Sequence, residues 1–416
     1  MSAPQSQHAV VFPSENDPLI DVRIRSRSQE PHIHHANIVL TALTDVIQAQ
    51  GITAASSRSA ITTAYFGALM LSIEQRSKHT TDTLAGIAHL LAIIFPQLPP
   101  SVLRAKAEDI TPLLLQLLEQ HADTTAIAKS TLACIATLLA ALDPSAATYL
   151  HSANLSLYRA LLVYSLDPRP KLRHLTQSKL ALFLSSFTAN NQQPPRPLMD
   201  ALLSFAQREV EAVEGKESSE VLYLCGLLQT TAPTLTLTCA GHLMELLLSL
   251  PLKQHTILLV QVMRTLVALA DRPATAAAQK VEVKHVVLLD RLLTALTTLL
   301  PHPSDIDANT AYLHTVERLV ALLATMDAVR GGSRVLQYVE VLTPLLLSSK
   351  PTVVRITSHT MARFLQSGIK ADWVRDVQAR QGDEVERLLK TCEVRYVDTH
   401  THTMCTDRWV VGGLLT

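Results

Sequence analysis

The sequence has few aromatic residues and few glycines. Phe, Trp and Tyr make up 4% of the 416 residues, and only 12 glycines occur. Strands are enriched in aromatic and β-branched side chains, and phosphate-binding loops depend on glycine, so the composition gives little support to a β-sheet or a nucleotide-binding loop. Leucine and alanine are abundant instead, and both favour helix. The sequence therefore predicts an all-α protein.

An excess of charge of one sign is also missing. The sequence has 36 Lys and Arg residues and 36 Asp and Glu residues, so its formal net charge is +0. A polyanion or a membrane surface would therefore have to be bound by local patches of charge. The apolar runs are too short to cross a bilayer, and the first 35 residues contain no signal-peptide core, which predicts a soluble protein.

The cysteines and histidines form no familiar metal or redox motif. The five cysteines include no C-x-x-C pair, which favours a reducing intracellular compartment. Three of them stand among apolar residues and are expected to be buried, namely Cys134, Cys225 and Cys239. Two further clusters hold fewer ligands than a structural zinc site needs, so we expect solvated side chains, with adventitious metal binding as the alternative; they are His32, His34 and His35, and His400, His402 and Cys405.

Catalytic motifs are missing as well. The sequence contains no G-x-S-x-G elbow, no G-x-x-x-x-G-K-[ST] phosphate loop and no H-E-x-x-H metal helix. We therefore expect a protein without enzymatic activity and without a cofactor. Tyr65 and Phe66 would suit stacking on RNA bases, but their apolar neighbours favour packing in the core.

What the sequence does contain is one helical segment after another. Short breaks separate these segments, for example at Asp167-Pro168, Gly331-Gly332 and Lys350-Pro351. Many segments form pairs of about 40 residues, a length typical of stacked helical repeats. We expect a disordered arm over 1–33, a helical-repeat solenoid over 34–392 and an irregular tail over 393–416.

Apolar residues recur at helical spacing within these segments. In the segment over 123–142 the apolar positions alternate in steps of four and three, which places them on one face; they are Ile127, Thr131, Cys134, Leu138 and Ala141. Leu172, Leu175 and Phe183 are expected to form a similar stripe, with Lys171 pointing away from it. Such stripes become buried when neighbouring pairs stack.

Two pair junctions share a layout. Residues 167–173 and 349–355 each place a proline in the turn and an apolar residue followed by Arg at the start of the next helix, and 123–129 is a degenerate third copy. This layout resembles the HEAT-repeat signature. The fold class expected is therefore an all-α solenoid of the HEAT or armadillo type, a superhelical stack of antiparallel helix pairs.

Several stretches resemble one family in particular. Residues 37–51, and above all the Thr-Ala-Tyr-Phe-Gly-Ala-Leu-Met run at 63–70, look like the amino-terminal region of the HEAT-repeat ribosomal RNA processing protein twelve family. The similarity extends over about residues 34–230. Family members are longer and end in a basic tail that residues 393–416 do not resemble, so the chain is expected to be a truncated or mis-spliced gene product.

The resemblance implies a non-catalytic scaffold in ribosome biogenesis. It implies binding of pre-ribosomal RNA and assembly proteins during rRNA processing and small-subunit maturation or export, with nuclear transport factors as further partners. It also implies a nuclear and nucleolar location, with shuttling to the cytoplasm left open. An importin-like transport receptor or a vesicle-trafficking adaptor is the alternative, because such solenoids share this architecture. No membrane partner and no small-molecule substrate are expected.

Basic residues near the helix openings are the candidate partner-binding sites. They would bind rRNA phosphates or acidic protein segments, whereas a plain solvated face is the alternative. Asp167 and Arg173 have a structural alternative, since turn acids and helix-opening arginines in HEAT-like stacks commonly bond within and between repeats. The candidates are Lys171, Arg173, Arg196, Lys350, Arg355 and Arg363.

Overall fold

The computed structural model describes six stretches of the chain: 17–24, 31–52, 56–190, 192–212, 219–270 and 283–369. These residues are almost entirely helical and contain no strand, which confirms the all-α prediction. Residues 1–202 and 203–416 form two compact units, and the division falls inside helix α11, Arg196–Glu211. Within the described stretches, no helix is both long and apolar enough to span a bilayer.

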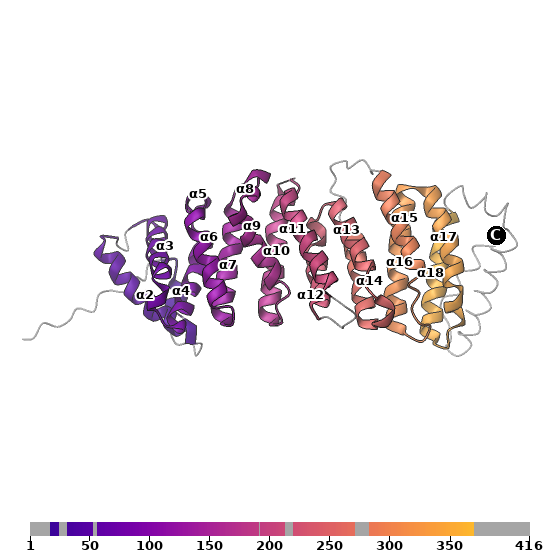
Figure 1. The fold of residues 1–416 in the computed structure, drawn as a ribbon, viewed down its shortest axis with the longest axis horizontal. Coiled ribbons are helices and arrows are strands. Elements are labelled where there is room, and N and C mark those ends of the chain that lie inside the picture. Colours follow the sequence, from indigo (N-terminus) through magenta and orange to yellow (C-terminus); the bar gives the residue numbers. More distant parts are fainter. Residues whose placement is uncertain are drawn as a thin grey trace, which may run out of the picture. The chain divides into compact units, whose positions relative to one another are not determined.

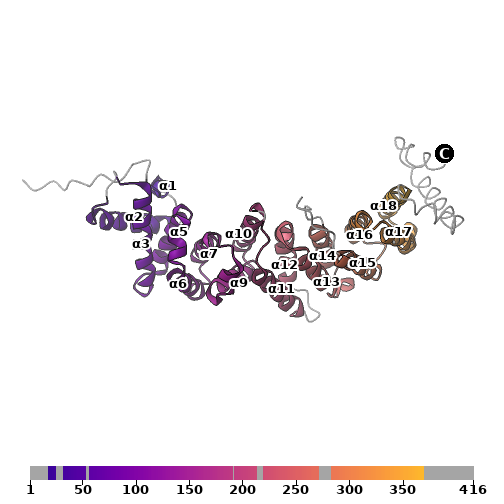
Figure 2. The same ribbon diagram turned by 90° about the horizontal axis from the view of Figure 1, so that it is seen from above.

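The first unit is a double layer of helices (Figure 1). Helices α2, α4, α7 and α10 pack in succession in one layer, and α3, α6 and α9 pack in succession in the other. Figure 2 shows α6 and α9 on one side of the unit and α7 and α10 on the other. The helices are α1 (Ile20–Ile24), α2 (Pro31–Ala49), α3 (Arg58–Glu74), α4 (Thr81–Ile94), α5 (Pro100–Ala105), α6 (Ala107–Gln120), α7 (Thr125–Ala141), α8 (Ala146–Leu150), α9 (Ser152–Tyr164) and α10 (Pro170–Ala189).

The second unit repeats this arrangement. Helices α12, α14, α16 and α18 pack in succession in one layer, and α13, α15 and α17 do so in the other (Figure 2). Their bounds are α12 (Ser219–Thr231), α13 (Leu237–Leu248), α14 (Thr256–Ala270), α15 (Val283–Thr297), α16 (Ile306–Met326), α17 (Ala328–Leu342) and α18 (Pro351–Ile369). The stacked pairs confirm the helical solenoid that the sequence predicts.

Short polar side chains determine where several helices begin. The Thr80 hydroxyl accepts a hydrogen bond from Thr83 N at 3.3 Å, and the Asp305 carboxylate accepts one from Ala308 N at 3.0 Å. Such caps satisfy backbone N–H groups that have no partner inside the helix. The stripe predicted on α7 is buried between the layers at four of its five residues, because Ile127, Thr131, Cys134 and Leu138 are all at most 1% exposed. Ala141, at the end of the helix, is only half-buried.

The glycine pair Gly331-Gly332 does not end a helix as predicted. Helix α17 runs through it, and its N-cap is Asp327, whose carboxylate accepts a hydrogen bond from Arg330 N at 3.0 Å. Each glycine costs a helix only about 1 kcal/mol. Burial of Tyr338 and Leu342 further along the same helix opposes that cost.

The expected disordered arm over 1–33 also differs from the structure where the structure describes it. Residues 20–24 form α1, and α2 already begins at Pro31. Leu19 and Val22 are buried, so a few apolar residues inside a polar stretch are enough to anchor α1. The last part of the expected solenoid, over 370–392, and the tail expected over 393–416 lie outside the described residues.

Arg23 ties this short helix to the rest of the first unit. Its guanidinium donates hydrogen bonds to the Asp17 carboxylate at 2.7 Å, to the Thr44 hydroxyl at 2.7 Å and to the Tyr65 hydroxyl at 3.1 Å. Tyr65 is 1% exposed, and Phe66 is buried beside it. Both aromatic residues therefore belong to the core, and neither forms an exposed platform for RNA bases.

Candidate partner-binding surface

A groove with a volume of about 950 Å³ lies on the first unit, lined by residues of α2, α4, α7 and α10. Lys171, which the sequence predicts as a binding residue, lines it together with Lys129 and Lys179. The remaining lining residues are His32, Ile33, His89, Ala92, Ile93, Thr125, Ala126, Ser130, Ala133 and Leu175. No carboxylate is among them. The groove therefore combines positive charge with an apolar surface.

The helical period places the two lysines of α10 in the groove. Lys171, Leu175 and Lys179 are four residues apart, which puts them on the same face of the helix. Leu172 lies beside this face, at the edge of the buried side of the helix, and is 0% exposed. The predicted stripe of Leu172, Leu175 and Phe183 is thus wrong at Leu175, which is only half-buried.

Three neighbouring helices of the first unit each carry charges of one sign only. Helices α7 and α10 contain Lys129, Lys171, Arg173 and Lys179 but no Asp or Glu. Helix α6 in the other layer contains three acids and no Lys or Arg. Lys129 and Lys179 were missed as candidates, although the absence of acids from these two helices is visible in the sequence.

The turn before α10 is held by two arginines. Arg169 donates to the Asp167 carboxylate through Nε at 2.9 Å and Nη2 at 2.8 Å, and to the Ala122 carbonyl at 2.9 Å. Arg173 donates to the carbonyls of Asp167 and Pro168 at 2.9 and 3.2 Å. Arg169 thus connects this turn to the loop between α6 and α7. The side chain of Arg173 bonds within its own turn.

The four other predicted residues lie elsewhere. Arg196 begins α11 and forms an exposed ion pair with Asp200 at 3.4 Å. Lys350 directly precedes α18, and Arg355 is exposed on that helix. Arg363 of α18 pairs with Glu317 of the neighbouring helix α16. Lys171 and Arg173 thus share α10 but not the groove, which only Lys171 lines. Lys350, Arg355 and Arg363 lie at or on α18.

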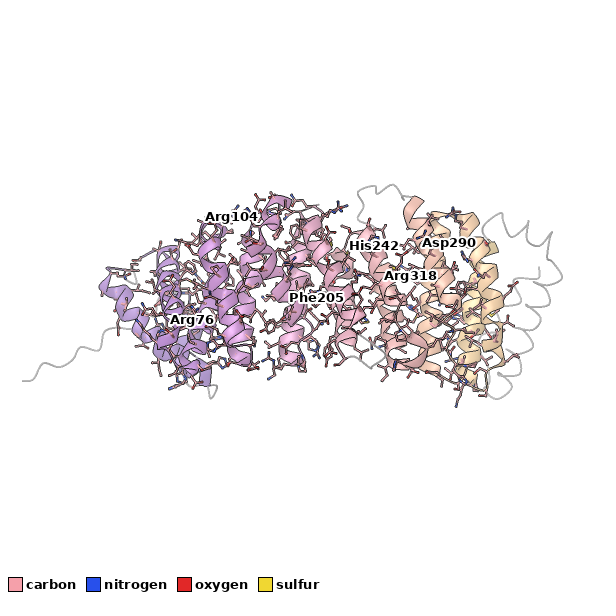
Figure 3. The ribbon with its side chains drawn as sticks, viewed as in Figure 1. Arg76, Arg104, Phe205, His242, Asp290 and Arg318 are labelled. Carbon is pink, nitrogen blue, oxygen red and sulfur yellow. The ribbon has the colours of Figure 1, made fainter. Side chains whose placement is uncertain are left out.

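Ion pairs connect successive helices of the second unit. Arg291 of α15 lies 3.9 Å from Glu245 of α13, and Arg334 of α17 lies 2.7 Å from Asp290 of α15, which is labelled in Figure 3. The hydrogen bond from Arg334 lowers the pKa of the Asp290 carboxyl, and partial burial opposes that effect. The partly buried pair of Arg334 and Asp290 links neighbouring repeats, whereas the exposed pair of Arg291 and Glu245 contributes little to stability.

The described cysteines are poor nucleophiles. Cys134, Cys225 and Cys239 are buried, as predicted. Burial raises the pKa of the Cys225 thiol to about 11 and that of Cys134 further still, so little thiolate is present at neutral pH.

In the described stretches no three His, Cys, Asp or Glu residues are grouped to hold a metal ion. His32, His34 and His35 lie on α2, and His400, His402 and Cys405 fall outside the described residues.

Replacing Asp167 by Asn is expected to destabilise the first unit by about 1–2 kcal/mol at neutral pH. The hydrogen bond from Arg169 lowers the pKa of the Asp167 carboxyl, and partial burial opposes that effect. A lowered folded-state pKa stabilises the fold above the unfolded value of about 3.9, and this stabilisation is lost as the pH falls through the folded pKa. Urea unfolding of both proteins between pH 3 and pH 7 measures the difference.

The matched control is Asp200→Asn. In the unchanged protein the Asp200 carboxylate is 59% exposed and pairs with the exposed Arg196. Its effect should stay within about 0.5 kcal/mol at every pH. If Asp167→Asn were as mild, or if its effect grew towards pH 3, the turn before α10 would not depend on this ion pair.

Comparison with known proteins identifies the repeats. Residues 22–277 match the family model of RRP12-like N-terminal HEAT repeats. The chain is 26% identical to the RRP12-like protein of Gallus gallus over 286 residues, which cover 67% of this chain and 21% of that protein. It is 24% identical to the RRP12-like protein of Homo sapiens over 333 residues, which cover 79% of this chain and 24% of that protein.

A third relative extends this set. The RRP12-like protein of Drosophila melanogaster is 28% identical over 148 residues, which cover 35% of this chain and 10% of that protein. The chain thus spans less than a quarter of the length of each of these relatives. The matched model covers more than half of the chain and includes every helix that lines the groove. The chain therefore belongs to the family of RRP12-like proteins, in the region of their N-terminal HEAT repeats.

Proposed function

We propose that this chain is a non-catalytic scaffold in ribosome biogenesis, which binds assembly proteins and rRNA precursors during small-subunit maturation or export. The family match over residues 22–277 carries the proposal. Stacked helix pairs offer a broad surface for partners, which suits a scaffold. A nuclear and nucleolar location, with shuttling to the cytoplasm, follows from the same proposal.

The basic groove supports this function because it lies inside the matched region. Lys129, Lys171 and Lys179 provide positive charge without a carboxylate in the lining. By contrast, Arg291, Arg334 and Arg363 of the second unit pair with neighbouring acids. Contacts with partner proteins should therefore contribute more to association with pre-ribosomal particles than direct contacts with RNA.

Affinity purification tests the proposal. The tagged chain is recovered from nuclear extract, with and without nuclease treatment, and its partners are identified. We expect small-subunit precursors and their assembly proteins, with the proteins largely retained after nuclease. Recovery of a transport GTPase with its cargo, or of vesicle-coat proteins, without ribosomal precursors would instead support the importin-like or adaptor alternative.

Direct RNA binding is expected to be weak and to depend only modestly on salt. Three groove lysines can neutralise about three phosphates, which gives a slope of log affinity against log salt of about −2 to −3 on duplex. Titration of structured rRNA fragments with the purified chain at several salt concentrations measures the slope. Nanomolar binding at physiological salt that is lost in Lys171→Glu/Arg363→Glu would show that RNA contacts dominate.

A further inference from the structure

The three groove lysines form no ion pair with any residue that the structure describes. None of Lys129, Lys171 and Lys179 forms a side-chain hydrogen bond with another described residue either, and no carboxylate lines the groove. Lys171 and Lys179 are eight residues apart, so their Cα atoms are separated by roughly 12 Å along α10. Lys129 adds a third charge from the neighbouring helix α7. An anionic ligand would therefore be attracted along an extended line.

The surface between the lysines is apolar. Ala126 and Ala133 of α7 lie on the groove one turn before and one turn after Lys129, and their small side chains leave room above that helix. Leu175 lies between the two lysines of α10, and Ile93 of α4 extends the apolar surface. A ligand that covered only the charges would leave this surface exposed to water.

The exposed face of α10 continues the same alternation. Lys171, Leu175, Lys179 and Leu182 follow one another at steps of four, four and three, and Leu182 is 61% exposed. Positive and apolar side chains thus alternate along one helix face over about three turns. A complementary partner would alternate negative and apolar side chains at a similar spacing.

The lining gives little support to nucleic-acid bases as ligand. It contains no Phe, Tyr or Trp on which a base could stack and no Arg for bidentate contacts. The two aromatic side chains that it does contain, His32 and His89, lie edge to face with ring centroids 5.4 Å apart. Lysines alone recognise any anion, so the apolar surface decides which class of anion fits.

We propose that this groove binds a short acidic, amphipathic peptide segment, in which Leu or Ile side chains pack on Ala126, Ala133 and Leu175 while Asp or Glu side chains pair with the lysines. Helical peptides dock in grooves by such apolar anchors at positions i, i+3, i+4 and i+7. The further step, that this peptide belongs to a ribosome assembly protein, rests on the proposed function. The binding chemistry of the groove is independent of that function.

The test uses the purified full chain and a pool of labelled peptides of about four helical turns, roughly 15 residues. Each peptide has Leu or Ile at i, i+3, i+4 and i+7 and Asp or Glu at the flanking positions. Fluorescence anisotropy measures binding against three comparison ligands: the same peptides scrambled, the same peptides with Lys in place of the acids, and oligouridylate of matched charge. We expect the acidic amphipathic peptides to bind more tightly than all three.

Two triple variants with the same change in net charge locate the binding site. Lys129→Ala/Lys171→Ala/Lys179→Ala is expected to weaken binding of the peptide about tenfold or more, because it removes three charge contacts at once. The control changes three exposed lysines outside the groove, Lys78→Ala/Lys106→Ala/Lys253→Ala, and should weaken it less than twofold. The conservative variant Lys129→Arg/Lys171→Arg/Lys179→Arg keeps the charge and should keep the binding.

Any one of three outcomes would overturn the proposal. No peptide of the pool binds the chain, the groove variant and its control weaken peptide binding equally, or oligouridylate binds more tightly than every acidic peptide. Because these measurements use only the purified chain, their failure leaves the proposed role in ribosome biogenesis standing. Conversely, a failure to recover ribosomal precursors from nuclear extract would leave peptide binding by the groove intact.

Discussion

Replacing Leu172 by Asp is expected to unfold the first unit or to lower its free energy of unfolding by several kcal/mol. Leu172 is 0% exposed and lies on the face of α10 that also buries Thr176, Leu180 and Phe183. A carboxylate at this position would lose its water without gaining a partner, and the leucine contacts would be lost as well. Urea unfolding followed by circular dichroism measures the change.

The neighbouring Lys171→Glu is the matched control. Lys171 is exposed on the groove, so reversing its charge should change stability by no more than about 0.5 kcal/mol. The two variants introduce an acid at adjacent positions of one helix and differ mainly in burial. Equal losses of stability would mean that α10 is rotated from the orientation described, and the groove would then lose two of its lysines.

Adding one methyl group at Gly86 is expected to destabilise the first unit even though alanine favours helix. A Cβ at this position would lie 2.7 Å from Ala36 N and 2.9 Å from His35 C, both backbone atoms of α2. These atoms cannot swing away as a side chain would, so α2 and α4 must move apart. The expected cost of about 1–3 kcal/mol exceeds the gain of up to about 1 kcal/mol in helix propensity.

Gly67 provides the opposite case. It lies exposed within α3, and a Cβ there would meet nothing within 4 Å. Gly67→Ala should therefore stabilise the protein by about 0.5–1 kcal/mol. Thermal melting of both variants checks the pair. A rise in melting temperature for Gly86→Ala would show that α2 does not approach α4 this closely, and the end of the groove formed by His32 and His89 would have to be redrawn.

Helix content and pairing were predictable because they depend on local signals. The stripe on α7 follows from the helical period alone, and the proline after Asp167 separates α9 from α10. The prediction of a break at Gly331-Gly332 was wrong because α17 is stabilised there by burial of Tyr338 further along the helix. Such burial is a tertiary effect that local sequence does not show. The charged turns were less predictable, since the bond from Arg169 to the Ala122 carbonyl joins residues 47 positions apart.

The candidate site was predictable only in part for a similar reason. The sequence indicates where α10 begins, and Lys171 was found as a basic residue near that opening. It does not indicate that Lys129 of α7 lines the same groove, because that depends on which helices become neighbours. Leu175 was assigned to the core since a leucine at helical spacing is normally buried. The structure places it in the lining of the groove.

The most direct measurement of the central claim is a pulse-chase of ribosomal RNA in cells depleted of this chain. If the chain is a scaffold of small-subunit maturation, precursors of the small-subunit rRNA should accumulate while large-subunit rRNA matures at its normal rate. Re-expression of the chain should restore the normal pattern, and re-expression of Leu172→Asp should not. Unchanged processing of both rRNAs after depletion would contradict the account.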